Sequence, residues 1–217
     1  GDQSGMAEKS GLLNLGAIAS AQVSLLPGAL ALFRRDFPAW RIRIVPGVSL
    51  NLLAQVDSDE IDSAVIIRPP FALSSDLQWQ PLVTEPFVLL VPDAHAHLHW
   101  RDVICAEPFI RYDRRSFGGR QVERFLRRMR LEVRDAIECD ELQVIVELVA
   151  RGMGVALLPE AAALGAWPAG VIALPLGDDT FFREVGLVRR SRRDTQPAAE
   201  HLAGCVIESA ALVARCA

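Results

Sequence analysis

The first 68 residues alternate between short apolar segments and segments with helical spacing. Apolar side chains recur three and four positions apart in the helical segments, whereas the strand segments are uniformly apolar or alternate polar and apolar residues. The predicted order is strand 12–19, helix 24–37, strand 41–45, helix 49–57 and strand 61–67. Pro38 ends the first helix, and Ser49 is expected to cap the second. This β-α-β-α-β order predicts an α/β fold with a parallel sheet.

A second block of alternating elements follows with different spacing. It consists of strands 77–84, 87–91 and 108–112, helix 117–129, strand 131–138, helix 141–150 and strands 155–158, 171–174 and 185–188. Asp140 is expected to cap the helix that follows it, and Gly152 to end that helix in the left-handed conformation. A final amphipathic helix, residues 197–214, has no sheet partner nearby and is expected to return over the first block.

This order predicts two α/β lobes joined by two crossing strands, residues 85–91 and 184–190. Lobe I then comprises residues 11–84 and 191–217, and lobe II comprises residues 85–190. We expect residues 1–10 to be a linker or a remnant of cloning. The opening Gly1-Asp2-Gln3-Ser4-Gly5 lacks the basic and apolar stretches of a signal peptide.

The composition is that of a globular protein with a slightly acidic balance. Of the 217 residues, 23 are Lys or Arg and 27 are Asp or Glu, which gives a net charge of -4. This balance argues against direct binding of nucleic acid, which usually needs a basic stripe. No apolar run reaches the roughly 18–20 residues that span a bilayer, so no membrane partner is expected.

The cysteines and lysines narrow the chemistry further. The four cysteines (Cys105, Cys139, Cys205 and Cys216) contain no CxxC pair, and we expect reduced, mostly packing thiols in a cytoplasmic protein. Lys9 is the single lysine. The body of the chain therefore lacks a lysine for a Schiff base and a GxxxxGKS/T phosphate loop, and no cofactor is expected.

Two groups of residues resemble a known family. The first group is Leu15-Gly16-Ala17, Leu25-Leu26-Pro27, Phe33, Phe37-Pro38 and Ile61-Asp62. The second is Glu107-Pro108-Phe109-Ile110 and residues 148–159, LVARGMGVALLP. In order and spacing, over roughly residues 11–215, they resemble the effector-binding domain of LysR-type transcriptional regulators. The resemblance implies two Rossmann-like lobes with the type 2 periplasmic-binding-protein arrangement.

The resemblance also implies a sensing function without catalysis. A small-molecule effector, expected to be a carboxylate, would bind between the lobes and change their relative angle. The domains would pair as a homodimer or tetramer, with the first helix of one subunit against the second lobe of its neighbour. Residues 1–10 are too short for the family's winged helix-turn-helix domain, so DNA contact is expected only through that missing domain.

Helix N-termini beyond the carboxyl ends of the strands are the expected ligand site, because their free N–H groups favour anions. The starts near residues 17–20, at Ser49 and at residues 116–119 meet this description. Arg68, at the end of the third strand, suits bidentate carboxylate binding, and Arg115 adds positive charge. The candidate effector-binding residues are Ser20, Ser49, Arg68, Arg114, Ser116 and Phe117. By resemblance, Ser20, Ser49, Arg68 and Phe117 fall close to family positions that contact effectors.

Several of these residues also have purely structural explanations. Ser49 can act as a helix cap alone, Arg68 as a solvated loop residue and Phe117 as a core residue. The alternate histidines of residues 95–99 are of a type that binds transition metals. They follow a turn where the family has a variable surface loop, so no metal site is expected.

Two other functions compete with the sensor. An enzyme is disfavoured because the chain has no GxSxG elbow, HExxH motif or Cys–His neighbourhood. A periplasmic solute-binding protein would share the two-lobed fold, so fold alone does not separate it from a cytoplasmic regulator. The free cysteines and the GMGVALLP segment favour the regulator.

Overall fold

The computed structural model describes residues 10–192 and 195–216. The chain divides into two compact units. Unit 1 comprises the described residues up to Val83 and from Glu184 onward, and unit 2 comprises Thr84–Arg183. The expectation for residues 1–10 concerns a segment that lies, apart from Ser10, outside the described residues. No helix within the described ranges is long and apolar enough to cross a membrane.

Unit 1 is built on three parallel strands with helices between them. Its elements are β1 (Gly11–Ala17), α1 (Ala19–Ser24), α2 (Leu26–Asp36), β2 (Trp40–Pro46), α3 (Ser49–Asp57), β3 (Ser63–Ile67) and α7 (Pro197–Cys216). β1 pairs in parallel with β2 and β3, and β9 (Phe182–Arg190) runs antiparallel to β3. Ala17 lies opposite Pro46 on one side and Val65 on the other. The carboxyl ends of the three parallel strands therefore share one edge of the sheet.

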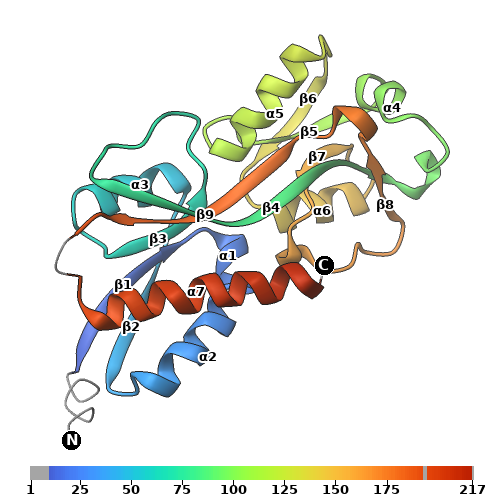
Figure 1. Ribbon diagram of the computed structural model, residues 1–217. Helices are drawn as coiled ribbons and strands as arrows, with labels where there is room; N and C mark the ends of the chain where they lie inside the picture. Colours follow the sequence, from blue (N-terminus) through green and yellow to red (C-terminus); the bar gives the residue numbers. More distant parts are fainter. Residues whose placement is uncertain (1–9, 193–194, 217) are drawn as a thin grey trace, which may run out of the picture. The chain divides into compact units, whose positions relative to one another are not determined.

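The first helical segment is two helices, and not the single helix 24–37 expected from the sequence. α1 ends at Ser24, and α2 begins at Leu26 with Pro27 in its first turn, where a missing N–H costs little. α7 packs on α2, where the Ser209 hydroxyl donates to the Leu25 carbonyl oxygen at 2.7 Å. The last helix thus returns over the first block as predicted (Figure 1).

Unit 2 combines an antiparallel group of strands with a parallel pair. Its helices and strands are α4 (Trp100–Ala106), β5 (Pro108–Tyr112), α5 (Phe117–Arg128), β6 (Arg134–Cys139), α6 (Leu142–Ala150), β7 (Ala156–Pro159) and β8 (Val171–Pro175), with short 3-10 turns at Asp93–His95, Ala162–Leu164 and Gly177–Asp179. β4 (Leu77–Pro92) pairs antiparallel with β7 and β8, and β5 pairs in parallel with β6. Phe87, Trp100, Phe109 and Phe125 belong to the buried core of this unit.

The two ends of α6 can be compared with the caps expected from the sequence. Glu141, and not Asp140, occupies the N-cap of α6, and its side chain makes no capping bond. Gly152 follows α6 with a φ of 72°, which confirms that it ends the helix in the left-handed region. α4 was not expected, because its seven residues are too few to show helical periodicity.

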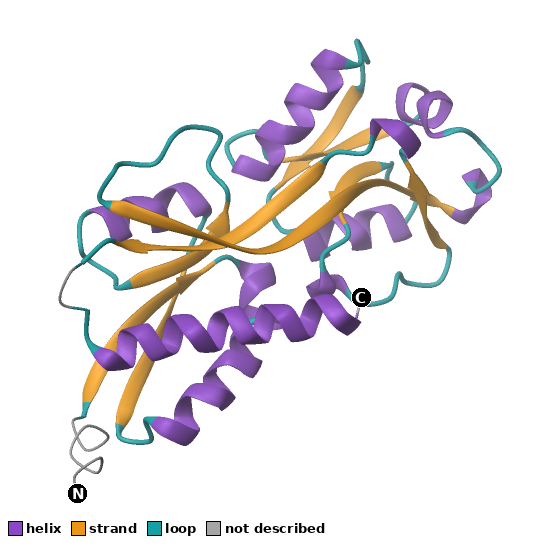
Figure 2. Cartoon of the chain, in the orientation of Figure 1, coloured by secondary structure: helices purple, strands orange, loops and turns teal. Residues whose placement is uncertain are grey.

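β4 and β9 are the strands that pass from one unit to the other. β4 is one uninterrupted strand of 16 residues, and not two strands separated by Glu85-Pro86 (Figure 2). The unit boundaries fall between Val83 and Thr84 and between Arg183 and Glu184. Most of β9 therefore lies in unit 1, whereas residues 184–190 were expected in lobe II.

Candidate functional site

The carboxyl edge of the unit 1 sheet brings together three of the predicted site residues. Ser20 lies in the first turn of α1, Ser49 begins α3, and Arg68 follows the last residue of β3. Because β1 and β3 are adjacent parallel strands, these three positions come from neighbouring points on one edge. The Ile18 N–H donates to the Val65 carbonyl oxygen at 3.1 Å and fixes the start of α1 beside β3.

Ser49 is buried and is not the expected helix cap. Val48 occupies the N-cap of α3 without a side-chain capping bond. The Ser49 side chain is 4% exposed, and its hydroxyl accepts a hydrogen bond from the Ile67 N–H at 3.1 Å. Ser49 therefore joins the start of α3 to the end of β3, immediately before Arg68.

Ser20 remains half-buried at the start of a short helix. Its carbonyl oxygen accepts a hydrogen bond from the Ser24 hydroxyl at 2.9 Å. α1 has six residues, and its N-cap Ile18 offers no side-chain oxygen. The start of α1 therefore presents a serine and backbone groups at this edge, without a charged side chain.

Arg68 has a definite partner in β9. Its Nη1 donates to Glu184 Oε2 at 2.8 Å, and its backbone N–H donates to the Glu184 carbonyl oxygen at 2.8 Å. The Arg68 side chain is 62% exposed, whereas that of Glu184 is 22% exposed. A second partner of Glu184 is the Trp79 indole, whose Nε1–H donates to Oε1 at 3.3 Å. Sequence reasoning missed Glu184 and Trp79, because both come from strands distant in the chain.

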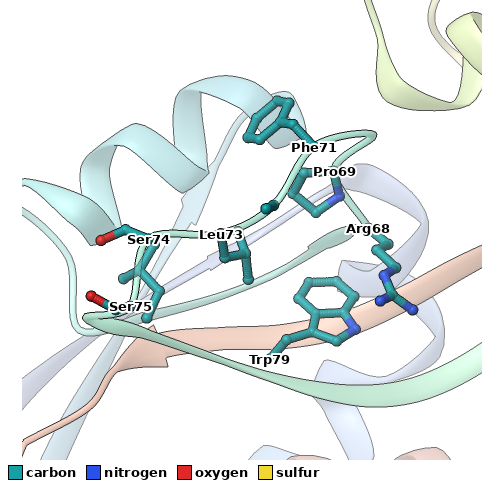
Figure 3. Close-up of a pocket in the computed structure, with 9 residues that line it drawn as sticks. Arg68, Pro69, Phe71, Leu73, Ser74, Ser75 and Trp79 are labelled. Carbon is teal, nitrogen blue, oxygen red and sulfur yellow. The ribbon is translucent and has the colours of Figure 1, made fainter.

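A pocket opens directly beside Arg68 (Figure 3). It has a volume of about 360 Å³ and is formed by the connection from β3 to β4 and by the first residues of β4. Its lining residues are Arg68, Pro69, Phe71, Ala72, Leu73, Ser74, Ser75, Leu77 and Trp79. This connection carries no sequence motif, so none of its residues after Arg68 was expected at the site.

In unit 2, Ser116 stands at the start of α5, and its proposed contact with an effector stays a prediction. It is the N-cap of α5, and its hydroxyl accepts a hydrogen bond from the Gly119 N–H at 2.9 Å. The two glycines that follow are closely packed. A Cβ on Gly118 would clash with the Tyr112 ring, and one on Gly119 would clash with the Asp113 carbonyl oxygen.

Phe117 is buried, although it was expected to stack against a ligand. Its side chain is 1% exposed, among the largest fully buried side chains in the described ranges. The Arg120 guanidinium lies 5.6 Å from its ring centroid. The burial of Phe117 is compatible with the core alternative, and contact with an effector stays a prediction.

Arg114 and Arg115 are each engaged by a neighbouring carboxylate. Arg114 donates from Nε and Nη2 to the two oxygens of Glu138, at 3.3 and 3.2 Å, and Arg115 donates from Nη2 to Asp113 at 2.9 Å. These hydrogen bonds hold the pKa values of Glu138 and Asp113 below their usual range. The expected surplus of positive charge at the start of α5 is thus largely neutralised by these carboxylates.

A buried ion pair that sequence reasoning missed stands where both crossing strands enter unit 2. Arg183 donates from Nε to Glu85 Oε1 at 2.7 Å and from Nη1 to the Tyr112 hydroxyl at 3.3 Å. Burial raises the pKa of Glu85, although the charge of Arg183 opposes this shift. Burial also raises the pKa of Tyr112, which leads into the loop before α5. The pair joins β4, β9 and β5 within one unit.

The histidine segment has structural partners. His95 Nε2 lies 3.6 Å from a Glu107 oxygen, and His99 Nδ1 accepts a hydrogen bond from the Arg101 N–H at the start of α4. Within the described residues, no group of three or more His, Cys, Asp or Glu side chains could hold a metal ion. The cysteines are free, but only Cys205 is buried, so the expectation of packing thiols fits that one best.

Comparison with known proteins shows the family to which the chain belongs. The family model described as the LysR substrate binding domain matches residues 7–211. The chain belongs to this LysR family. Among curated relatives, an uncharacterized HTH-type transcriptional regulator of Escherichia coli K12, YbhD, is 27% identical over 202 residues, covering 91% of this chain and 63% of that protein. TtuA of Agrobacterium vitis is 31% identical over 158 residues, covering 70% and 52%.

Solved LysR effector-binding domains share the fold. The QuiR domain in complex with shikimate aligns with a TM-score of 0.80 at 15% identity, covering 94% of this chain and 99% of that one. The BenM domain with its effector benzoate aligns with a TM-score of 0.76 at 18% identity, covering 94% and 93%. These matches confirm the predicted α/β fold with the two-lobed periplasmic-binding-protein arrangement.

Proposed function

We propose that this LysR-family domain senses a small organic acid and so controls DNA binding by a longer regulator. The observation that supports this proposal is the state of Arg68 at the carboxyl edge of the unit 1 sheet. Arg68 is the exposed cation there, and only one of its five N–H groups is engaged by Glu184. A guanidinium with unused donors at the ends of parallel strands is suited to a carboxylate.

The named ligands of related domains agree with this chemistry. Two of the solved neighbours hold shikimate and benzoate, both of which are carboxylates at neutral pH. A third, the regulatory domain of Synechocystis CcmR, is in complex with 2-PG. For the present chain these names support the class of ligand, an anion of small size, and leave the individual acid open.

The remaining parts of the proposal follow from the family. The chain spans 63% of YbhD and 52% of TtuA, so a DNA-binding domain would lie in the rest of the full-length protein. We propose that the domain self-associates, acts in the cytoplasm, has no catalytic function and reaches DNA only through that other domain. A ligand changes such an equilibrium only through its difference in affinity for the two states.

The test is a calorimetric titration of a panel of organic acids into the parent domain and into Arg68→Ala. Arg43→Ala, which removes another exposed arginine of unit 1, is the matched control. At least one acid is expected to bind the parent and the control alike, and Arg68→Ala at least about tenfold more weakly, since hydrogen bonds to charged groups contribute about 1.5–3 kcal/mol. Equal affinity for parent and Arg68→Ala, or no binding of any acid, would contradict the proposal.

A further inference from the structure

The pocket beside Arg68 has an aromatic wall. Trp79 lies on β4, and its indole faces the connection that runs from Pro69 to Ser75. Figure 3 shows Leu73 and Pro69 on one side of the indole and the Arg68 guanidinium beside its nitrogen-bearing edge. The pocket therefore combines a large ring with a cation at its margin, within a single unit.

The Trp79 ring is held in place by two residues of β9. Gly186 lies against it so closely that a Cβ at this position would come within 2.6 Å of the indole Cε2. Glu184 accepts the indole N–H at 3.3 Å. One side of the ring thus rests on a strand that lacks a side chain at that point, and the N–H is satisfied. A ring fixed in this way is a preorganised surface for stacking.

The charges at the pocket favour an anion over a cation. Both Glu184 oxygens already accept a hydrogen bond, one from Arg68 and one from Trp79, and the carboxylate is mostly covered. Arg68 is mostly exposed and has engaged a single N–H through its side chain in the described part of the chain. An incoming ligand therefore meets unused donors on Arg68, whereas the two oxygens of Glu184 are already engaged.

The size and setting of the pocket limit the ligand to a small molecule. Its volume of about 360 Å³ lies near the lower end of the range of roughly 300–1,000 Å³ for small-molecule sites. The connection that forms its outer wall is mostly exposed and also borders a second hollow of about 180 Å³ against α3. A wall with this little packing can adjust to a ligand.

We propose that this pocket binds an aromatic carboxylate, with the ligand ring stacked on Trp79 and the carboxylate on the free donors of Arg68. The inference rests on the proposed function in one respect, the use of Arg68 for a carboxylate. It adds that the ligand carries an aromatic ring and that this ring contacts Trp79. The buried Phe117, expected from the sequence to stack on the ligand, has no part in it.

The probes are benzoate, cyclohexanecarboxylate and acetate, titrated calorimetrically into the parent domain. Benzoate and cyclohexanecarboxylate have nearly the same size and charge, but only benzoate has an aromatic ring. Benzoate is expected to bind about threefold to tenfold more tightly than cyclohexanecarboxylate, which corresponds to the roughly 0.5–1.5 kcal/mol of an aromatic pair. Benzoate is also expected to quench indole fluorescence.

Three substitutions identify the ring responsible. Trp79→Leu is expected to abolish both the preference for benzoate and the quenching, whereas Trp79→Phe keeps the preference. Trp40→Phe, at another half-buried tryptophan of unit 1, is the matched control and should change neither the affinity nor the preference. Circular dichroism establishes that each variant is folded.

Glu184→Gln tests the charge argument through an expected gain in affinity for benzoate. It removes the negative charge that competes for Arg68 and keeps an oxygen to accept the Trp79 N–H. Benzoate is expected to bind this variant more tightly than the parent. Weaker or unchanged binding would contradict the charge argument.

The outcomes separate this inference from the proposed function. If all three acids bind equally, or if Trp79→Leu keeps the preference for benzoate, the aromatic site is refuted, while loss of binding in Arg68→Ala still supports a carboxylate sensor. If none of the three acids binds, the aromatic site is also refuted, and the wider panel then decides the proposed function.

Discussion

Arg183 and Glu85 form a buried ion pair in which Nε and Nη2 of the arginine each lie 2.7 Å from the same carboxylate oxygen. Arg183 is 1% exposed, so water does little to solvate its charge, and the Glu85 carboxylate is the opposite charge that pairs with it. We therefore predict that Glu85→Ala lowers the free energy of unfolding by about 3–5 kcal/mol, the usual cost of leaving one buried charge unpaired.

The double variant Glu85→Leu with Arg183→Met is the informative control. It removes both charges, and we expect it to be more stable than Glu85→Ala alone, because no buried charge is left over. Chemical denaturation measures both variants. A Glu85→Ala variant that is as stable as the parent would mean that Arg183 finds adequate compensation elsewhere.

The hydroxyl of Ser49 is predicted to contribute to stability. Ser49→Ala removes the acceptor of the buried Ile67 N–H and is expected to lower the free energy of unfolding by about 1–3 kcal/mol. Ser74→Ala, at an exposed serine in the connection before β4, should lower it by less than about 0.5 kcal/mol. Urea denaturation compares the two. An unchanged midpoint for Ser49→Ala would show that another group satisfies Ile67.

Gly119 is predicted to tolerate no side chain. Gly119→Ala would place a Cβ against the Asp113 carbonyl oxygen at the start of α5 and is expected to cost about 1–3 kcal/mol. Gly204→Ala, in α7, meets nothing within 4 Å and should stabilise the domain by up to about 1 kcal/mol. Thermal unfolding should therefore shift in opposite directions for the two substitutions. A shift in the same direction would contradict the close approach at Gly119.

The acid sensitivity of unit 2 is predicted from two carboxylates. Hydrogen bonds from Arg115 and Arg114 lower the pKa values of Asp113 and Glu138 below their ordinary 3.8 and 4.5. The unfolded chain then binds more protons than the folded one in this range. The stabilising contribution is complete above these ordinary values and is lost as the pH falls through the lower, folded-state values.

The combined variant Asp113→Asn, Glu138→Gln should flatten the dependence of the unfolding free energy on pH below about 4.5. Glu132→Gln is the control, because Glu132 is exposed and has no ion pair with any residue that the structure describes. The effect should shrink in high salt, which screens exposed pairs. Equal slopes for the double variant and the parent would contradict the assignment.

Local patterns predicted the first half of the fold, and long-range contacts account for the errors. Apolar spacing identified the strands and helices of residues 11–67, because period and turn residues are local properties. Pro27 was assigned to a helix interior, although it begins a new helix. Pro86 suggested a break between two strands, although β4 continues through it.

The candidate site was predicted in part. The carboxyl edge with Ser20, Ser49 and Arg68 follows from the strand order, which sequence patterns show. The role of Ser49 depends on Ile67, 18 residues away, and the partner of Arg68 lies 116 residues away in Glu184. Pairings between residues so far apart in the chain do not affect the periodicity of the sequence. The ion pair of Arg68 with Glu184 and the packing of Trp79 against Gly186 therefore could not be predicted from it.

The most direct test of a carboxylate sensor at Arg68 is an NMR titration of the isotope-labelled domain with benzoate, which follows the Arg68 Nε–H and the Trp79 Nε1–H. Both resonances are predicted to shift in the parent domain until the site is saturated. In Arg68→Ala, where only the Trp79 signal remains, that signal is predicted not to shift. No shift at millimolar benzoate would refute the aromatic site alone, whereas binding shifts confined to residues away from Arg68 would contradict the account.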